Sequence, residues 1–300
     1  MIRLGIIGLD STHAVEFVRL FNIERVAADM RVVAACAGAP TTFPLSLGRS
    51  ERIERQVRDE FAVPVVNSAP ELLEQVDAVL LLSCDGRSHG REIQPVLAAR
   101  KPVFIDKPLS ADWREAAQIL RAARVAGAPC FTASALRFRI VAELAIRLRR
   151  KPPLMLRVDV PRHREPGHPD LSWHGIHGVE AGYAVLGAGC QSVRRSITHD
   201  TDVTTGVWPD GSSLLINRTL EDSGREFRMS VASSDGEHLL HGHDYRGLVE
   251  AIAAFFRTGR PPVSAAEMVE VLAFIAAADE SREAGGAAVA LTERLAMIEL

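Results

Sequence analysis

The sequence lacks several features, and each absence narrows the class of protein. No apolar run approaches the roughly 18 residues that a membrane-spanning helix needs. No C-x-x-C pair occurs, so neither a zinc knuckle nor a disulfide framework is expected, and the four cysteines indicate reduced thiols. The formal net charge is only -3, which gives no electrostatic reason to bind nucleic acid or an anionic membrane.

The sequence also lacks an internal repeat, a low-complexity segment and a charged leader, because its first residues already form a strand-like run. We therefore expect a cytoplasmic protein whose partners are a small-molecule substrate and copies of itself. The 300 residues exceed the usual size of one hydrophobic core, which predicts two domains.

Short apolar runs alternate with amphipathic stretches in the first part of the chain. The predicted strands are 4–7, 32–36, 78–82, 103–105 and 130–133. The predicted helices, with Ser68 and Ser110 as caps, are 51–61, 70–76, 91–100 and 111–126. Parallel strands need crossover connections that cover both faces of their sheet. The pattern therefore predicts an N-terminal α/β domain, residues 1–125, with a doubly wound parallel sheet.

The pattern changes after about residue 150, where short turns separate the apolar runs. The predicted strands are 154–160, 192–199, 206–208, 213–220, 226–233 and 238–241. The predicted helices are 172–186, which interrupts these strands, and 245–258 and 265–283, which close the chain. We therefore predict a C-terminal α+β domain, residues 126–300, with a largely antiparallel open sheet.

The first strand ends in a turn that, in a Rossmann fold, has the sequence G-x-G-x-x-G and lets the backbone approach a pyrophosphate. Here the turn is Gly8-Leu9-Asp10-Ser11-Thr12-His13, so Asp10 and His13 replace two glycines. An acid at this place repels a pyrophosphate unless it turns away to cap the following helix. The turn alone is therefore typical of a capped helix as much as of a cofactor site.

Two later segments are more specific. One is Ser83-Cys84-Asp85-Gly86-Arg87-Ser88-His89, and the other is Asp106-Lys107-Pro108-Leu109 with the strand before it. They resemble the T-P-N-x-x-x-H and A-G-K-x-V-x-x-E-K-P-L segments of the glucose-fructose oxidoreductase, inositol dehydrogenase and MocA-like (Gfo/Idh/MocA) family, with Asp106 replacing a glutamate. Further similarity at 136–138 and 261–267 extends the resemblance over nearly the whole chain.

The resemblance implies a dinucleotide-binding Rossmann domain at 1–125 and a substrate-binding and oligomerisation domain at 126–300. It also implies a homo-oligomer, a dimer or a tetramer. The residues that it assigns to the cofactor are Gly8, Leu9, Asp10, Ser11, Thr12, Ser83, Asp85, His89, Asp106 and Lys107.

The family lysine lies between cofactor and substrate, and the resemblance gives this role to Lys107. Oxidation of a secondary alcohol requires removal of the hydroxyl proton as hydride leaves for the nicotinamide ring. A lysine near other cations, or shielded from water, has a pKa low enough to take part. The alternative is a surface lysine that merely follows a strand.

The segment from Asp170 to Glu180 resembles the family's D-x-G-x-H-x-x-D helix. His177 matches the histidine and Glu180 the last acid, but Trp173 stands where the family keeps a substrate-contacting aspartate. An indole cannot exchange a proton at neutral pH. If redox chemistry persists, His177 or the additional His174 must handle the proton together with Lys107. The expected substrate contacts are Arg137, Trp173 and Glu180.

The identity of the cofactor and a metal site stay open at this stage. No acid for the adenosine ribose ends the second strand, and Arg49 or Arg52 is available for a 2′-phosphate, so NAD and NADP are both compatible with the sequence. Potential metal ligands within one short stretch are His163, His168, Asp170, His174, His177 and Glu180. We expect no metal there, because no H-E-x-x-H motif is present and the neighbouring arginines favour an anion- or sugar-facing loop.

The leading hypothesis is an NAD(P)-dependent oxidoreductase that acts on a sugar, a polyol or a related hydroxylated small molecule. A second hypothesis is a lyase or glycosidase-type enzyme that uses bound NAD transiently. The third is a nonredox ligand-binding or regulatory protein, because the glycine turn, the ribose acid and the aspartate at position 173 are all replaced.

Overall fold

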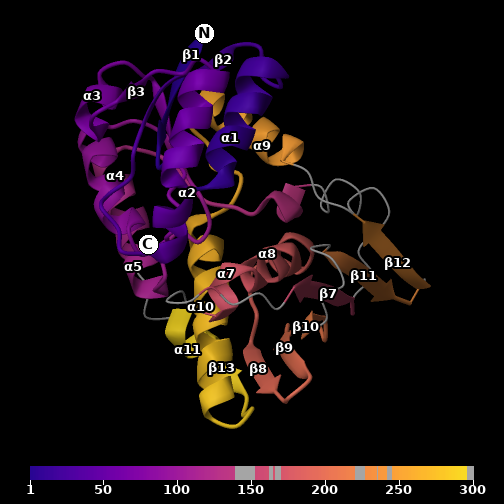
Figure 1. Ribbon diagram of the computed structural model, residues 1–300. Helices are drawn as coiled ribbons and strands as arrows, with labels where there is room; N and C mark the ends of the chain where they lie inside the picture. Colours follow the sequence, from indigo (N-terminus) through magenta and orange to yellow (C-terminus); the bar gives the residue numbers. More distant parts are fainter. Residues whose placement is uncertain are drawn as a thin grey trace. The chain divides into compact units, whose positions relative to one another are not determined.

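The computed structural model describes residues 1–138, 153–161, 165, 170–219, 227–234, 236–241 and 245–295. The chain divides into two compact units (Figure 1). The first unit consists of Met1–Ala133 and Tyr245–Ala265, and the second of Ser134–Asp244 and Ala266–Leu300. The chain therefore returns to the first unit with residues 245–265, which the sequence analysis had placed in the C-terminal domain.

The first unit is built on a six-stranded parallel sheet, of which the apolar runs predicted five strands and missed Val65–Val66. Its strands are β1 (Ile2–Ile7), β2 (Met30–Cys36), β3 (Val65–Val66), β4 (Ala78–Leu81), β5 (Val103–Ile105) and β6 (Cys130–Phe131). Their order is β3-β2-β1-β4-β5-β6, and every neighbouring pair is parallel. The order reverses between β1 and β4, and ligands of such sheets bind at the carboxyl ends of the strands beside this point.

Helices cover both faces of this sheet. They are α1 (Thr12–Val18), α2 (Pro44–Arg55), α3 (Ala69–Leu73), α4 (His89–Ala98), α5 (Trp113–Ala126) and α9 (Arg246–Thr258). Single π-helical turns, Arg19–Ile23 and Gln56–Glu60, extend α1 and α2. The crossover connections place α1 and α2 on one face and α3, α4 and α5, which pack side by side, on the other. On the α1 face, aromatic contacts join Phe17 to Phe104, Phe104 to Phe131 and Phe131 to Phe255 of α9.

Local hydrogen bonds fix where several helices begin. Ser68 caps α3 as predicted, because its side chain accepts the backbone N–H of Glu71. The predicted cap Ser110 is wrong, since Asp112 caps α5 by accepting the N–H groups of Arg114 and Glu115. The hydroxyl of Ser110 instead bonds the Glu115 carboxylate.

The second unit contains a seven-stranded open sheet. Its strands are β7 (Met155–Pro161), β8 (Ser192–Ile197), β9 (Thr201–Val207), β10 (Ser213–Thr219), β11 (Arg228–Ser233), β12 (Gly236–His241) and β13 (Val289–Ala290). Their order is β12-β11-β7-β10-β9-β8-β13. All neighbouring pairs are antiparallel except β7 and β10, so the predicted, largely antiparallel sheet is confirmed.

The helices of the second unit are α7 (Asp170–Trp173), α8 (Gly175–Leu186), α10 (Ala265–Glu283) and α11 (Thr292–Leu295). The long α8 packs closely on β7 and β10 because glycines face the sheet. A Cβ atom at Gly182 would lie 2.3 Å from Leu214 Cδ2, and one at Gly178 would lie 3.1 Å from Val160. None of the described helices is long and apolar enough to cross a membrane.

A buried charge network ties α7 to the second sheet. Arg195 of β8 and Arg218 of β10 are fully buried, and both bond the buried Asp202 of β9 at 2.8–2.9 Å. Both also bond Asp170 at the start of α7, at 2.6 and 3.0 Å, and Arg195 contacts Asp279 of α10 at 2.5 Å. Burial alone would raise the pKa of Asp170, but the hydrogen bonds and charges of the two arginines lower it strongly. The network therefore fixes the segment that leads to Trp173 and His174.

Replacing Arg195 with methionine should therefore destabilise the protein strongly. Methionine fills much of the space of the arginine side chain but carries no charge. Asp202 and Asp170 therefore lose one of the two arginines that neutralise them. Breaking a buried ion pair from one side costs about 3–5 kcal/mol. We expect a loss of that order in the free energy of unfolding, measured by urea titration at pH 7.

Arg194→Met is the matched control, because Arg194 is the exposed neighbour on the same strand. It should change the free energy of unfolding by no more than about 0.5 kcal/mol. Equal losses in the two variants would contradict the role of the network.

Candidate functional site

The turn after β1 keeps one glycine because the backbone requires it. Gly8 has a φ of 99°, which favours glycine, and its N–H donates to the Cys36 carbonyl at 3.0 Å. A Cβ atom at this position would lie 2.3 Å from the backbone N of Ser83. The first glycine of the motif therefore serves close packing between the turn and the segment after β4.

Asp10 turns away, but it does not cap the helix. Its carboxylate accepts the N–H of Cys84 at 3.0 Å and the hydroxyl of Ser46 at 2.5 Å. Ser11 caps α1 instead, because its side chain accepts the N–H of His13 at 3.2 Å. The acid that would repel a pyrophosphate is thus held by donors from two other segments.

His13 and Asp106, the replacements in the two motifs, contact each other directly. His13 Nδ1 lies 2.6 Å from the Asp106 carboxylate, and both side chains are almost fully buried. On its other side, His13 Nε2 lies 2.9 Å from the hydroxyl of Tyr245, the residue before α9. One chain of hydrogen bonds therefore joins the turn after β1, the end of β5 and the start of α9.

Asp106 is held ionised by this contact. Burial alone would raise its pKa, but the charge and hydrogen bond of His13, followed by the charge of Lys107, bring the pKa below its ordinary value. Its Oδ1 atom is buried and accepts no hydrogen bond from the residues that the structure describes. Such an acceptor suits a hydroxyl donor of a ligand, for example a ribose hydroxyl.

Lys107 lies two residues after the end of β5 and is half-buried. The next residue, Pro108, is fixed by His89, which lies at the start of α4 and has no exposed surface. One ring nitrogen of His89 lies 3.0 Å from the Pro108 carbonyl and the other 2.8 Å from the Ser83 carbonyl. His89 therefore connects the two segments that follow β4 and β5, and it positions the backbone next to Lys107.

Two acids near this edge of the sheet are already engaged by protein groups. Asp85, a predicted cofactor contact, binds the guanidinium of Arg87 at 2.8 Å through both oxygens. Glu92, which the sequence did not single out, accepts the Ala39 N–H at 2.5 Å and the Ser83 hydroxyl at 3.0 Å. The sequence signal for Glu92 was its place as an acid in the first turn of an amphipathic helix. Its carboxylate reaches the end of β2, where the sequence has no acid of its own.

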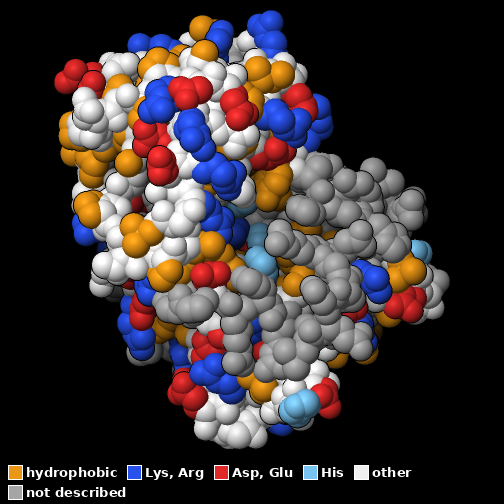
Figure 2. Space-filling model, viewed as in Figure 1, with side chains coloured by type: hydrophobic (Ala, Val, Ile, Leu, Met, Phe, Trp, Pro, Cys, Tyr) orange, Lys and Arg blue, Asp and Glu red, His pale blue; other side chains and the backbone are white. Residues whose placement is uncertain are grey.

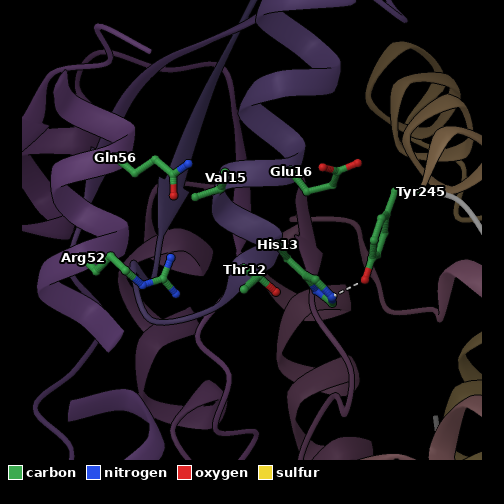
Figure 3. Close-up of a pocket in the computed structure, with 7 residues that line it drawn as sticks. All are labelled: Thr12, His13, Val15, Glu16, Arg52, Gln56 and Tyr245. Atoms are coloured by element: carbon green, nitrogen blue, oxygen red, sulfur yellow. Dashed lines mark hydrogen bonds between the residues drawn. The ribbon is translucent and has the colours of Figure 1, made fainter. Parts of the chain in front are cut away.

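A pocket of about 290 Å³ lies beside the first turn of α1 (Figure 3). Its lining residues are Thr12, His13, Val15, Glu16, Arg52, Gln56 and Tyr245. The figure shows Arg52 of α2 and Gln56 of the π-helical turn after it reaching in on one side, with Tyr245 on the other side and its hydroxyl on His13. The lining therefore offers hydroxyl, amide, imidazole and guanidinium groups, together with the Glu16 carboxylate and apolar carbon atoms.

These residues fit a dinucleotide better at the phosphates than at the adenosine ribose. Around the turn, Asp10 is turned away, and Thr12 and Arg52 offer donors. At the end of β2, Ala37 and Gly38 offer no side-chain oxygen. Near Lys107, the open Oδ1 acceptor of Asp106 suits a hydroxyl group.

In the second unit, the predicted catalytic histidines lie in a row of aromatic rings. Trp173 stacks on His174 with ring centroids 5.9 Å apart, and His174 lies 6.3 Å from His177. His177 Nδ1 lies 2.7 Å from the hydroxyl of Ser134, a buried residue after β6 that the sequence analysis missed. Ser134 therefore fixes the orientation of the His177 ring.

Arg137 and Glu180, both predicted to contact substrate, bind each other instead of facing an open space. Arg137 Nε donates to Glu180 at 2.8 Å, and its Nη2 donates to Glu267 of α10. Both side chains are buried. Burial and the second acid raise the pKa of Glu180 despite the opposing effect of Arg137. A contact with substrate stays a prediction for this pair.

A metal site finds no support within the described ranges. No group of three or more His, Cys, Asp or Glu side chains there is arranged to hold an ion. His163 and His168, two of the ligands considered from the sequence, lie outside the described residues.

Asp106→Asn should reduce stability at neutral pH and remove part of its dependence on acid. Because the pKa of Asp106 is below the ordinary 3.8, the ionised carboxylate stabilises the fold above that pH. This contribution is lost as the pH falls through the lowered pKa. We expect urea titrations between pH 7 and pH 3 to show a steeper acid loss of unfolding free energy in the unmodified protein than in the variant.

The control is Asp200→Asn, which changes an exposed acid in the turn between β8 and β9. Its pH curve should run parallel to that of the unmodified protein. The same shallow acid loss in Asp200→Asn as in Asp106→Asn would contradict the assignment to the buried pair.

Comparison with known proteins identifies the first unit. The profile of the Gfo/Idh/MocA oxidoreductase family, NAD-binding Rossmann fold, matches residues 2–134. A probable dehydrogenase from Thermotoga maritima is 20% identical with a TM-score of 0.77, over 97% of this chain and 99% of that one. A myo-inositol dehydrogenase from Lactobacillus casei, in complex with NAD(H) and myo-inositol, is 17% identical with a TM-score of 0.74, over 97% and 96%.

An oxidoreductase from Agrobacterium radiobacter, in complex with NAD+, L-tartaric acid and magnesium, is 14% identical with a TM-score of 0.76, over 98% of this chain and 99% of that one. At such identities these structures show a shared fold. No curated protein matches the chain. The parallel sheet, the glycine turn after β1 and the family match to residues 2–134 together lead to one conclusion: the chain contains an NAD-binding Rossmann domain of the Gfo/Idh/MocA oxidoreductase family.

Proposed function

We propose that the protein is an NAD(P)-dependent oxidoreductase that acts on a sugar, a polyol or a related hydroxylated small molecule. The observation that supports this most is Lys107, which follows β5 at the carboxyl edge of an NAD-binding Rossmann sheet. Structural neighbours of this fold hold NAD(H) with myo-inositol and NAD+ with L-tartaric acid, both polyhydroxylated molecules. We further propose that the first unit binds the dinucleotide, that the second binds substrate, and that the chain forms a homo-oligomer, a dimer or a tetramer.

Lys107 is proposed as the proton-transfer residue. A bound nicotinamide would supply the hydride acceptor or donor. The amine of Lys107 takes the hydroxyl proton when an alcohol is oxidised and returns it when a carbonyl is reduced. His89 positions the neighbouring Pro108 carbonyl, and Asp106 stays ionised beside the lysine through His13.

His177 is proposed as the substrate-side partner, with His174 as the alternative. Trp173 cannot exchange a proton, so an imidazole has to replace the missing aspartate if the proton is shared. Ser134 holds the Nδ1 side of His177, which restricts the ring to one orientation. Such restriction is what a group that binds and orients a hydroxyl requires.

The second candidate function is nonredox ligand binding or regulation on the same fold. Two observations favour it: an indole occupies the position of the family aspartate, and Ala37 and Gly38 leave the end of β2 without a side-chain carboxylate of its own. This candidate requires no nucleotide affinity, whereas both enzyme hypotheses require it. A lyase or glycosidase-type enzyme would differ from a dehydrogenase in retaining its NAD through turnover.

Calorimetric titration of the nucleotide-stripped protein with NADH and with NADPH tests the proposal. Micromolar binding of either supports an enzyme and determines the cofactor. Absence of binding to both would contradict the proposal and favour the nonredox candidate.

Lys107→Met should abolish most of the turnover while leaving nucleotide binding intact. The methionine keeps the length of the side chain but removes the amine, and positioned acid–base groups contribute about 10²–10⁴-fold to rates. We expect kcat for the best substrate of a sugar and polyol screen to fall by that factor. NADH or NADPH affinity should change by less than about threefold, which corresponds to well under 1 kcal/mol.

Lys101→Met is the matched control, because Lys101 precedes β5 while Lys107 follows it. It should leave kcat unchanged. A Lys107→Met variant with full turnover would remove Lys107 from the mechanism.

A further inference from the structure

Arg52 faces the pocket beside α1 as a cation with no acidic partner among the described residues. It reaches in from α2, and Figure 3 shows its guanidinium level with Thr12 in the first turn of α1. Two charged neighbours, in contrast, are paired. Arg58, further along the same segment, bonds Glu54 and Asp59, and Glu16 in the pocket wall bonds Arg19.

The segment that carries Arg52 is highly charged, and its arginines alternate with the acids Glu51, Glu54, Asp59 and Glu60. Figure 2 shows a stripe of Lys and Arg side chains over the region of α2 and α1. The arginines of α2 and its extension are Arg49, Arg52, Arg55 and Arg58. Arg52 alone among these four lines the pocket. Guanidinium, hydroxyl and amide groups donate hydrogen bonds to phosphate oxygens in many protein sites, and all three line this pocket.

We propose that Arg52, with the hydroxyl of Thr12, binds the pyrophosphate of the dinucleotide from the side of α2. This inference rests on the proposed function, because it presupposes that a dinucleotide binds. In a turn with the sequence G-x-G-x-x-G, the backbone contacts the pyrophosphate. Here the inference assigns that contact to the side chains of Arg52 and Thr12.

The pocket's position favours the pyrophosphate over a 2′-phosphate as the group that Arg52 binds. A 2′-phosphate belongs to the adenosine ribose, which lies at the end of β2, here Ala37 and Gly38. The pocket is lined instead by residues of α1, of α2 and its π-helical extension, and by Tyr245, and it includes no residue from the end of β2. Arg52 therefore acts on NAD and NADP alike and does not decide between them.

The replacement of two glycines explains why such a side-chain contact is needed. His13 occupies the third glycine position and is committed to Asp106, while Asp10 occupies the second and is committed to Cys84 and Ser46. Two side chains thus fill the space where glycines let a phosphate approach the backbone closely. A long, forked side chain from a neighbouring helix reaches a phosphate that stays further out.

The test compares Arg52→Ala with Arg55→Ala, which removes the same charge from the same helix outside the pocket. Each variant and the unmodified protein are titrated calorimetrically with NADH, NADPH and ADP-ribose at fixed salt. We expect Arg52→Ala to weaken all three ligands by a similar factor of about ten, because one charge-assisted hydrogen bond is lost. Arg55→Ala should weaken them by less than about twofold, through the general field alone.

Three results would overturn the inference, and each is distinct. An equal loss of ligand affinity in Arg52→Ala and Arg55→Ala would mean that Arg52 acts only through its long-range positive charge and not by direct contact. Weakening of NADPH alone would assign Arg52 to the 2′-phosphate. Failure of the unmodified protein to bind any of the three ligands would end the proposed function and this inference with it, whereas the first two results leave the proposed function standing.

Discussion

The organisation of the first unit depends on the hydrogen bond between His13 and Asp106. The two residues are 93 positions apart and follow β1 and β5, which flank β4 in the sheet. Because both side chains are almost fully buried, water cannot hydrogen-bond the imidazole or solvate the carboxylate, and the two groups depend on each other. Tyr245 completes the chain of hydrogen bonds and ties in α9. The turn after β1 and the segment after β5 that carries Lys107 are thus held together.

This contact changes how the departures from the family motifs should be understood. Taken singly, a histidine in place of a glycine and an aspartate in place of a glutamate each suggest a damaged cofactor site. Together they form one buried pair, so the first unit remains consistent with nucleotide binding. Trp173 is different, because the Asp170 network fixes the segment before it but supplies no group that exchanges a proton. The chemistry of the second unit is therefore where a redox and a nonredox protein would differ.

The sequence predicted most of the fold because buried parallel strands are continuous apolar runs, as in β4 and β5. It did not predict β3 or β13, which have only two residues each, and it placed a strand at 206–208 where β9 is Thr201–Val207. It misplaced a cap at Ser110, because a local hydrogen bond to Glu115 competed for that hydroxyl. The sequence predicted only part of the site. Motifs led to Lys107 and His177. The contacts of His13, Glu92 and Ser134 join segments far apart in the sequence, and a local sequence pattern does not show such contacts.

The return of residues 245–265 to the first unit affects how the protein is made. Phe255 of α9 packs on Phe131 of β6, and Tyr245 closes the hydrogen bonds of His13. On the ribosome, residues 1–133 must wait for more than a hundred further residues before their aromatic layer and their histidine are covered. Until then the six strands of the first sheet are all present but lack the cover of α9. The strands β7 to β12 of the second sheet are synthesised before α9, and β13 only after it, so the two units finish folding in an interleaved order.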